Sequence, residues 1–163
     1  MSQTTSVGVT CRAASTLDAP YSGRGVSSVD FRQRWTSGTG NNEADIHGQV
    51  EQAVAGSGNV DLDLRAIEGP DGDALNGVEL AGLIIEVPAA ASGNISVKVA
   101  SANGVDFLDG TTDSVVLRPG GVMCLLYPRD GGPTLGASDR LINLANAGGS
   151  STTVTVTTIQ RSA

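Results

Sequence analysis

The stretch that decides the fold lies near the end of the chain, where Thr152–Gln160 has the sequence TTVTVTTIQ. Threonine, valine and isoleucine branch at Cβ, and their stiff side chains favour extended backbone over helix. Apolar and polar residues also alternate in Val60–Arg65 and in Ile95–Val99. This period of two predicts strands with one buried and one solvated face. Val78–Val87 is apolar on both faces, which predicts a central strand.

Turn signals separate these runs. The chain has 22 glycines and 6 prolines, and clusters containing glycine recur about every ten residues, a spacing typical of β-sandwiches and barrels. Asn42–Ala55 is the best helical candidate, but it is short and lacks a strong cap, and a strand within Ile46–Val54 is the alternative. We expect an all-β antiparallel sandwich of about seven or eight strands with almost no helix. Further strands are expected in Ser114–Arg118, Val122–Tyr127 and Leu141–Leu144.

Charge and length exclude several classes of protein. The chain has 163 residues and a formal charge of −7, whereas nucleic-acid binding normally requires a basic surface. No apolar run approaches the roughly 18 residues that a membrane span needs. The first residues lack the charged and apolar segments of a signal peptide. We therefore expect neither a nucleic acid nor a membrane as partner.

The first forty residues differ from the rest of the chain. Residues 1–40 contain four arginines and two aspartates, a net charge of +2, whereas residues 41–163 have a net charge of −9. We expect an extended N-terminal arm over residues 1–40 and the sandwich over residues 41–163. A mildly basic arm on an acidic body is suited to docking on an acidic partner or on neighbouring copies.

Aromatic side chains gather in this arm. Tyr21, Phe31 and Trp35 lie there, whereas disordered linkers are normally poor in aromatics. Large rings in a polar arm indicate either anchoring to a partner or a strand that folds on its own domain. Arg32 and Arg34 are candidates for bidentate pairing with a partner's carboxylates.

Candidate catalytic residues are few. His47 is the single histidine, with Asp45 and Glu51 nearby, but a catalytic triad also needs a serine in a strained turn and no GxSxG motif is present. Asp61 and Asp63 resemble a carboxylate pair, but their alternation with leucine favours the wet face of a strand. We expect no enzyme.

Metal and cofactor sites are not expected either. Cys11 and Cys124 lack metal-ligand spacing; Cys124 is interpreted as a buried thiol, and a bridge between the two rests on their number alone. The acidic loops Glu68–Asp73 and Asp106–Asp113 could bind calcium weakly, but neither matches an EF-hand, and aspartates in such loops commonly cap turns.

Two segments carry a family resemblance. Thr112–Val122 has the sequence TDSVVLRPGGV, and Asp139–Gly148 has the sequence DRLINLANAG, followed by the Thr/Val strand. Together with the preceding strands, residues 59–160 resemble tailed-phage virion proteins that decorate or cement the capsid. The long arm has no match in that family.

The resemblance implies a jelly-roll-like sandwich that assembles as a homotrimer on the outer surface of the phage head. The implied partners are the major capsid protein and neighbouring copies of the chain, with synthesis in the host cytoplasm. Arg118 and Arg140 are the candidates for subunit edges. The alternative is a carbohydrate-binding or structural module of a head fibre or tail, but sugar binding needs exposed aromatic platforms. The body offers only Phe107 and Tyr127, and Tyr127 is expected in a core strand.

Overall fold

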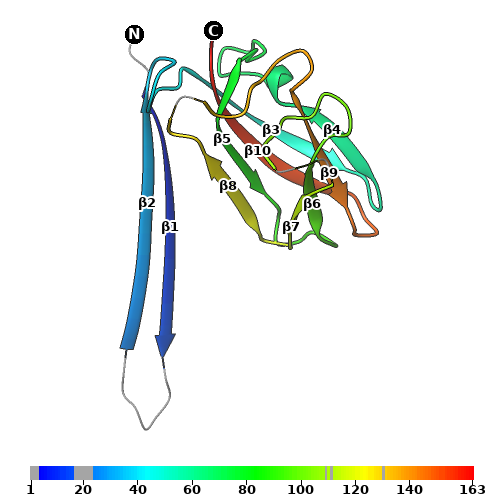
Figure 1. Cartoon of the computed structure of the whole chain (residues 1–163). Helices are drawn as coiled ribbons and strands as arrows, with labels where there is room; N and C mark the ends of the chain where they lie inside the picture. The colour runs from blue at the N-terminus through cyan, green and yellow to red at the C-terminus, as the bar shows by residue number, and fades with distance from the viewer. Residues whose placement is uncertain (1–3, 17–23, 109, 111, 130) are drawn as a thin grey trace.

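The chain folds into a β-sandwich with a long β-hairpin projecting from it (Figure 1). The computed structural model describes residues 4–16, 24–108, 110, 112–129 and 131–163, and describes side chains from Gln33 onward. The expectation of an all-β sandwich is confirmed, and no helix of the described residues is long and apolar enough to cross a membrane.

Eight strands form the sandwich in two four-stranded antiparallel sheets. The first sheet has the order β3-β10-β5-β8 and the second the order β4-β9-β6-β7. This pairing, in which the first and last strands of the body lie side by side, is the jelly-roll arrangement. The strand bounds are β3 (Ile46–Val54), β4 (Asn59–Asp63), β5 (Glu79–Glu86), β6 (Ile95–Val99), β7 (Ser114–Leu117), β8 (Val122–Leu126), β9 (Leu141–Asn146) and β10 (Thr152–Arg161).

The β-branched stretch Thr152–Gln160 lies in β10, an inner strand between β3 and β5. Val154 and Val156 are fully buried, whereas Thr153 is exposed and Thr155 is half-buried. The predicted central strand is confirmed as β5, which lies between β10 and β8. Alternation therefore separates the two faces of β10 as expected, because successive side chains point to opposite faces of a sheet.

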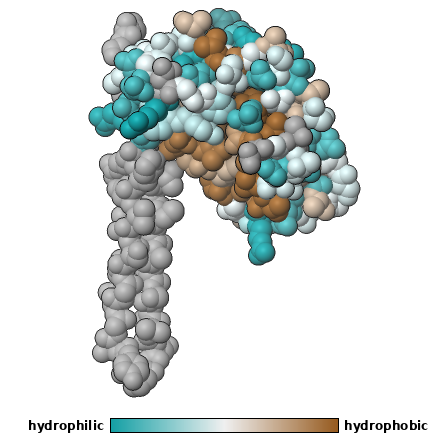
Figure 2. Space-filling model, viewed as in Figure 1, coloured by the Kyte–Doolittle hydropathy of each residue, from teal (hydrophilic) through white to brown (hydrophobic). Residues whose placement is uncertain are grey.

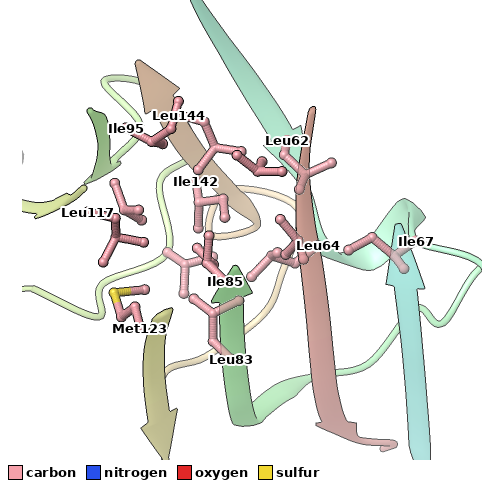
Figure 3. Packing of buried hydrophobic residues seen from close by; sticks show 14 of the residues in the cluster. Leu62, Leu64, Ile67, Leu83, Ile85, Ile95, Leu117, Met123, Ile142 and Leu144 are labelled. Carbon is pink, nitrogen blue, oxygen red and sulfur yellow. The ribbon is translucent and has the colours of Figure 1, made fainter. Parts of the chain in front are cut away.

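The core lies between the two sheets and consists almost wholly of aliphatic side chains (Figure 3). Leu83 and Ile85 of β5 face Ile142 and Leu144 of β9, and all four are 0% exposed. Burying each such side chain stabilises the fold by roughly 1.5–3 kcal/mol relative to leaving it in water.

Two local expectations are corrected or resolved by the structure. Ile46–Val54 forms strand β3 and not a helix, because its backbone hydrogen-bonds to β10 along its whole length. Leu64 does not extend β4 but begins a 3-10 turn, η1 (Leu64–Ala66). The carboxylate of Asp63 accepts a hydrogen bond from the backbone N–H of Arg65 at 3.0 Å, which caps this turn.

The extended N-terminal arm is a β-hairpin. Strand β1 (Thr4–Thr16) pairs in antiparallel register with β2 (Arg24–Thr36), and this two-stranded sheet is separate from both sheets of the sandwich. Figure 1 shows the hairpin leaving the end of the sandwich where the C-terminus lies, running past the side of the sandwich and extending beyond its opposite end. Each strand has 13 residues, which corresponds to about 40 Å of extended chain.

Replacing Leu144 by alanine tests the position of the core. Leu144→Ala is expected to lower the free energy of unfolding by about 2–5 kcal/mol, because it removes a fully buried side chain from the central strand β9. Urea denaturation followed by circular dichroism measures this loss. Val78→Ala, at a position 38% exposed, is the control and should change stability by about 0.5 kcal/mol or less. Equal losses in the two variants would contradict the assigned core.

Candidate functional site

The base of the hairpin is fixed to the sandwich by Trp35. Its side chain is 0% exposed and belongs to a second apolar cluster with Ala44, Ala81 and Ile159, against which Leu126 also packs. Backbone hydrogen bonds join the same region, since Thr36 donates to Asn42 at 3.0 Å and accepts from Ala44 at 2.9 Å. The hairpin is therefore attached at its base by a packed indole.

This burial corrects the prediction that Trp35 is a docking point for a partner. Its own chain covers the indole, which leaves no ring surface for another protein. For Trp35 the alternative of packing on its own domain is the one found. Tyr21 and the side chains of Phe31 and Arg32 lie outside the described residues. Arg34 is exposed, so it stays available as a partner-binding side chain.

The two arginines predicted at subunit edges lie at different places on the second sheet. Arg118 is exposed and follows β7, next to the end of β6 at which Ile95 pairs with Leu117. Arg140 precedes β9 at the opposite end, and its Nε lies 3.1 Å from an Asp63 carboxylate oxygen. The structure therefore does not bring Arg118 and Arg140 into one edge.

Exposed apolar side chains lie on the side of the sandwich formed by the edge strands β7 and β8. The outermost strands there are β7 and β8, which are consecutive in the chain and joined by a turn. Val116 of β7 is 54% exposed and Val122 of β8 is 59% exposed. Figure 2 shows apolar surface gathered on the sandwich over β8. We call this side, with Val116 and Val122, the β7/β8 edge.

A partly buried ion pair lies at the end of the sandwich from which the hairpin leaves. The guanidinium of Arg161 pairs with Glu79, donates through Nε to the carbonyl of Glu43 at 2.8 Å, and donates through Nη2 to the carbonyl of Tyr127 at 2.8 Å. The same Glu79 carboxylate oxygen accepts the backbone N–H of Gly132 at 2.9 Å. Arg161 is 1% exposed. No pattern in the sequence indicates this pair, because its members are 82 residues apart.

Beside this ion pair, three loop segments form an open cleft of about 750 Å³. Tyr127 directly follows β8 and is half-buried, which corrects the expectation that it lies inside a core strand. Burial raises the pKa of the Tyr127 hydroxyl above its ordinary value, so the phenol stays neutral at neutral pH. The cleft is lined by Asp106, Phe107, Leu108, Tyr127, Gly131–Thr134 and Asp139.

Two of the residues considered for catalysis line one small depression, and one of these two is already engaged in hydrogen bonds. The Asp45 carboxylate accepts hydrogen bonds from the backbone and hydroxyl of Ser162. His47 and Asp45 line the same small depression, together with Asp71 and Asp73. Among the described residues, no group of three His, Cys, Asp or Glu side chains is placed to hold a metal ion.

The strand carboxylates and the first acidic loop have structural partners. Asp61 is exposed and accepts a hydrogen bond from Asn143 at 2.7 Å, as expected for the wet face of β4. Asp71 accepts the backbone N–H of Asp73 at 3.2 Å and so caps a turn.

Cys124 is a free thiol and is half-buried, which corrects the expectation of a buried side chain. Burial raises its pKa, so it is a weak nucleophile at neutral pH. The side chain of Cys11 lies outside the described residues.

Comparison with known proteins adds little to this picture. No protein-family model matches the chain, and no curated protein sequence matches it. Among solved structures, the chain is similar to one described as the crystal structure of PirA, with 16% identity and a TM-score of 0.41. The match covers 68% of this chain and 92% of that one. Superposition at this level carries no inference about family or function.

The burial of Trp35 is open to a direct optical test, because it is the chain's one tryptophan. Its emission is expected at short wavelength and should be quenched only weakly by iodide in the native protein, with both properties lost on unfolding. Steady-state fluorescence with a Stern–Volmer titration measures this. A native quenching constant near that of the unfolded chain would show that the indole is not covered by the cluster with Ala44, Ala81 and Ile159.

Proposed function

We propose that this chain is a non-enzymatic virion protein that binds the outer surface of a tailed-phage capsid as a homotrimer and stabilises the capsid. The resemblance of residues 59–160 to capsid decoration proteins supports this function. The observation that carries it is the combination of a jelly-roll body with a projecting hairpin. A fold by itself does not assign a function, so the proposal depends on what the hairpin and the β7/β8 edge are able to bind.

The hairpin is suited to completion by a partner. Apart from a bridge between Thr36 and Glu43 at its base, its two strands form a sheet of their own, so both outer edges present backbone donors and acceptors. A two-stranded ribbon is only marginally stable in water, and addition of a partner strand along an edge would satisfy those groups. We propose the major capsid protein as this partner, reached from a sandwich that stays on the outside of the particle.

The sequence of the hairpin supplies two kinds of residue that could contact a partner. Its strands contain valine or phenylalanine at positions 7, 9, 29 and 31 and arginine at positions 12, 24, 32 and 34. Apolar residues bury area against a partner, and arginines pair with carboxylates such as those of a capsid protein.

Because Trp35 packs on the sandwich, it fixes the direction of the hairpin and does not itself anchor the partner. The proposed docking residues are therefore Tyr21, Phe31, Arg32 and Arg34. Trimer formation is assigned to the β7/β8 edge, where Val116 and Val122 are exposed and the sheet edges are unpaired. Arg118 follows β7 and lies beside this edge, whereas Arg140 is engaged with Asp63.

Removal of the hairpin tests the anchor. A chain that begins at Gln33 keeps Trp35 and should remain a folded sandwich, but it should fail to stay on capsids. The assay uses capsids purified from the virus that encodes this chain and stripped of it, followed by sedimentation with the intact or the shortened protein. Circular dichroism and Trp35 fluorescence confirm folding of the shortened chain. Retention equal to that of the intact protein would overturn the hairpin as anchor and shift the search to the loops of the sandwich.

Charged substitutions at the β7/β8 edge test the trimer. The wild-type mass from light scattering should be about three times the 16.4 kDa chain mass. The double variant Val116→Asp with Val122→Asp should yield monomers, because like carboxylates would be brought together in a desolvated interface. Val78→Asp introduces the same charge at the other end of β5 from Val122 and should leave the trimer intact. A monomeric wild type, both free and bound to capsids, would contradict the trimer.

A further inference from the structure

The cleft beside the Arg161–Glu79 pair combines two aromatic rings with two carboxylates. Phe107 and Tyr127 line it together with Asp106 and Asp139. Both rings are half-buried, Asp106 is exposed and Asp139 is half-buried. The volume of about 750 Å³ lies within the range of small-molecule sites. Three of the five aromatic residues lie in the arm, so the cleft brings together the only two that the body contains.

The walls of the cleft are held in place by the sandwich. On one wall, the backbone N–H of Leu80 donates to Pro133 at 2.8 Å, and that of Leu135 donates to Val78 at 2.7 Å. On the other wall, Val105 is fully buried and donates to Leu141 at 3.0 Å, which fixes the loop that carries Asp106 and Phe107. Because these walls are already ordered, binding a small ligand loses little conformational entropy of the protein, which favours recognition.

One glycine is required for this arrangement. A Cβ on Gly132 would lie 2.3 Å from the carbonyl oxygen of Leu80 and 3.2 Å from Cβ of Tyr127. Only glycine therefore lets the Gly131–Thr134 wall approach β5 so closely. The N–H of Gly132 is also bound by the Glu79 carboxylate at 2.9 Å, so the partly buried ion pair holds this wall of the cleft.

We propose that this cleft binds a neutral pyranose saccharide. The apolar C–H face of a sugar ring packs on an aromatic ring, and its hydroxyl groups donate to carboxylates and exchange hydrogen bonds with a neutral phenol. The cleft supplies both kinds of contact side by side. This inference does not depend on capsid binding, because the cleft is built from the sandwich alone.

The charge of the cleft decides between kinds of saccharide. The two lining carboxylates and the net charge of −7 disfavour uronic acids, sialic acids and phosphorylated sugars. Among the described residues that line the cleft, none is a lysine or arginine that could offset a ligand's negative charge. Neutral hexoses and N-acetylhexosamines are therefore the class that fits.

A printed array of neutral hexose and N-acetylhexosamine oligosaccharides, beside uronic-acid oligosaccharides, tests this with the intact chain. At least one neutral oligosaccharide should bind and the uronic acids should not. The affinity for the best neutral binder is then measured by calorimetry. An array with no neutral binder, or with uronic acids bound as well as neutral sugars, would overturn the proposal.

Substitutions locate the site. Asp106→Asn should weaken saccharide binding about tenfold, because it removes a charged hydrogen-bond acceptor. Asp106 is exposed, so the substitution should leave the fold intact. Phe107→Ala should weaken it at least about tenfold, with circular dichroism to verify the fold. Asp113→Asn removes an exposed carboxylate from outside the cleft lining and should leave the affinity unchanged. Equal affinities of wild type and Asp106→Asn would place the saccharide elsewhere and overturn the assignment.

Discussion

The arrangement of the molecule depends on a guanidinium that is buried at the end of its last strand. A charge out of water is tolerated only when it is paired and its donors are satisfied. Arg161 meets this condition by pairing with Glu79 of β5 and by donating to the carbonyls of Glu43 and Tyr127. Those groups come from the segment that enters β3, from β5 and from the end of β8. One side chain therefore ties together the entry of the sandwich, the first sheet and one wall of the cleft.

The base of the hairpin is held in the same region. Trp35 packs on Ala81 and Ile159, which come from the strands that carry the ion pair. Figure 1 shows the hairpin running from this end of the sandwich past its side. The proposed anchor and the proposed saccharide cleft thus start from one rigid end of the jelly roll. This arrangement would let the hairpin engage a capsid while the cleft loops, which lie at the end from which the hairpin departs, stay open to solvent.

Much of the fold could be predicted from local pattern. Alternation in Thr152–Gln160 and in Ile95–Val99 specified strands because one face of each is buried, and the apolar run at Val78–Val87 specified an inner strand. The pattern failed where an edge or a turn decided the outcome. The pattern in Asn42–Ala55 is compatible with a helix or a strand. Pairing with β10 decides for a strand, β3, over Ile46–Val54. The extended arm itself was predicted, but the pairing of Thr4–Thr16 with Arg24–Thr36 that makes it a hairpin depends on a register that composition does not encode.

The sequence by itself determined the class of the fold and the division between a basic N-terminal segment and an acidic body. Only the tertiary structure decided which side chains are available for binding. Trp35 is covered because Ala44, Ala81 and Ile159 converge on it from separate elements. Phe107 and Tyr127 share a cleft because loops from different strands end at the same place. Arg161 and Glu79 meet across 82 residues. Burial and proximity of this kind follow from the closing of the two sheets on each other, which no local run of residues specifies.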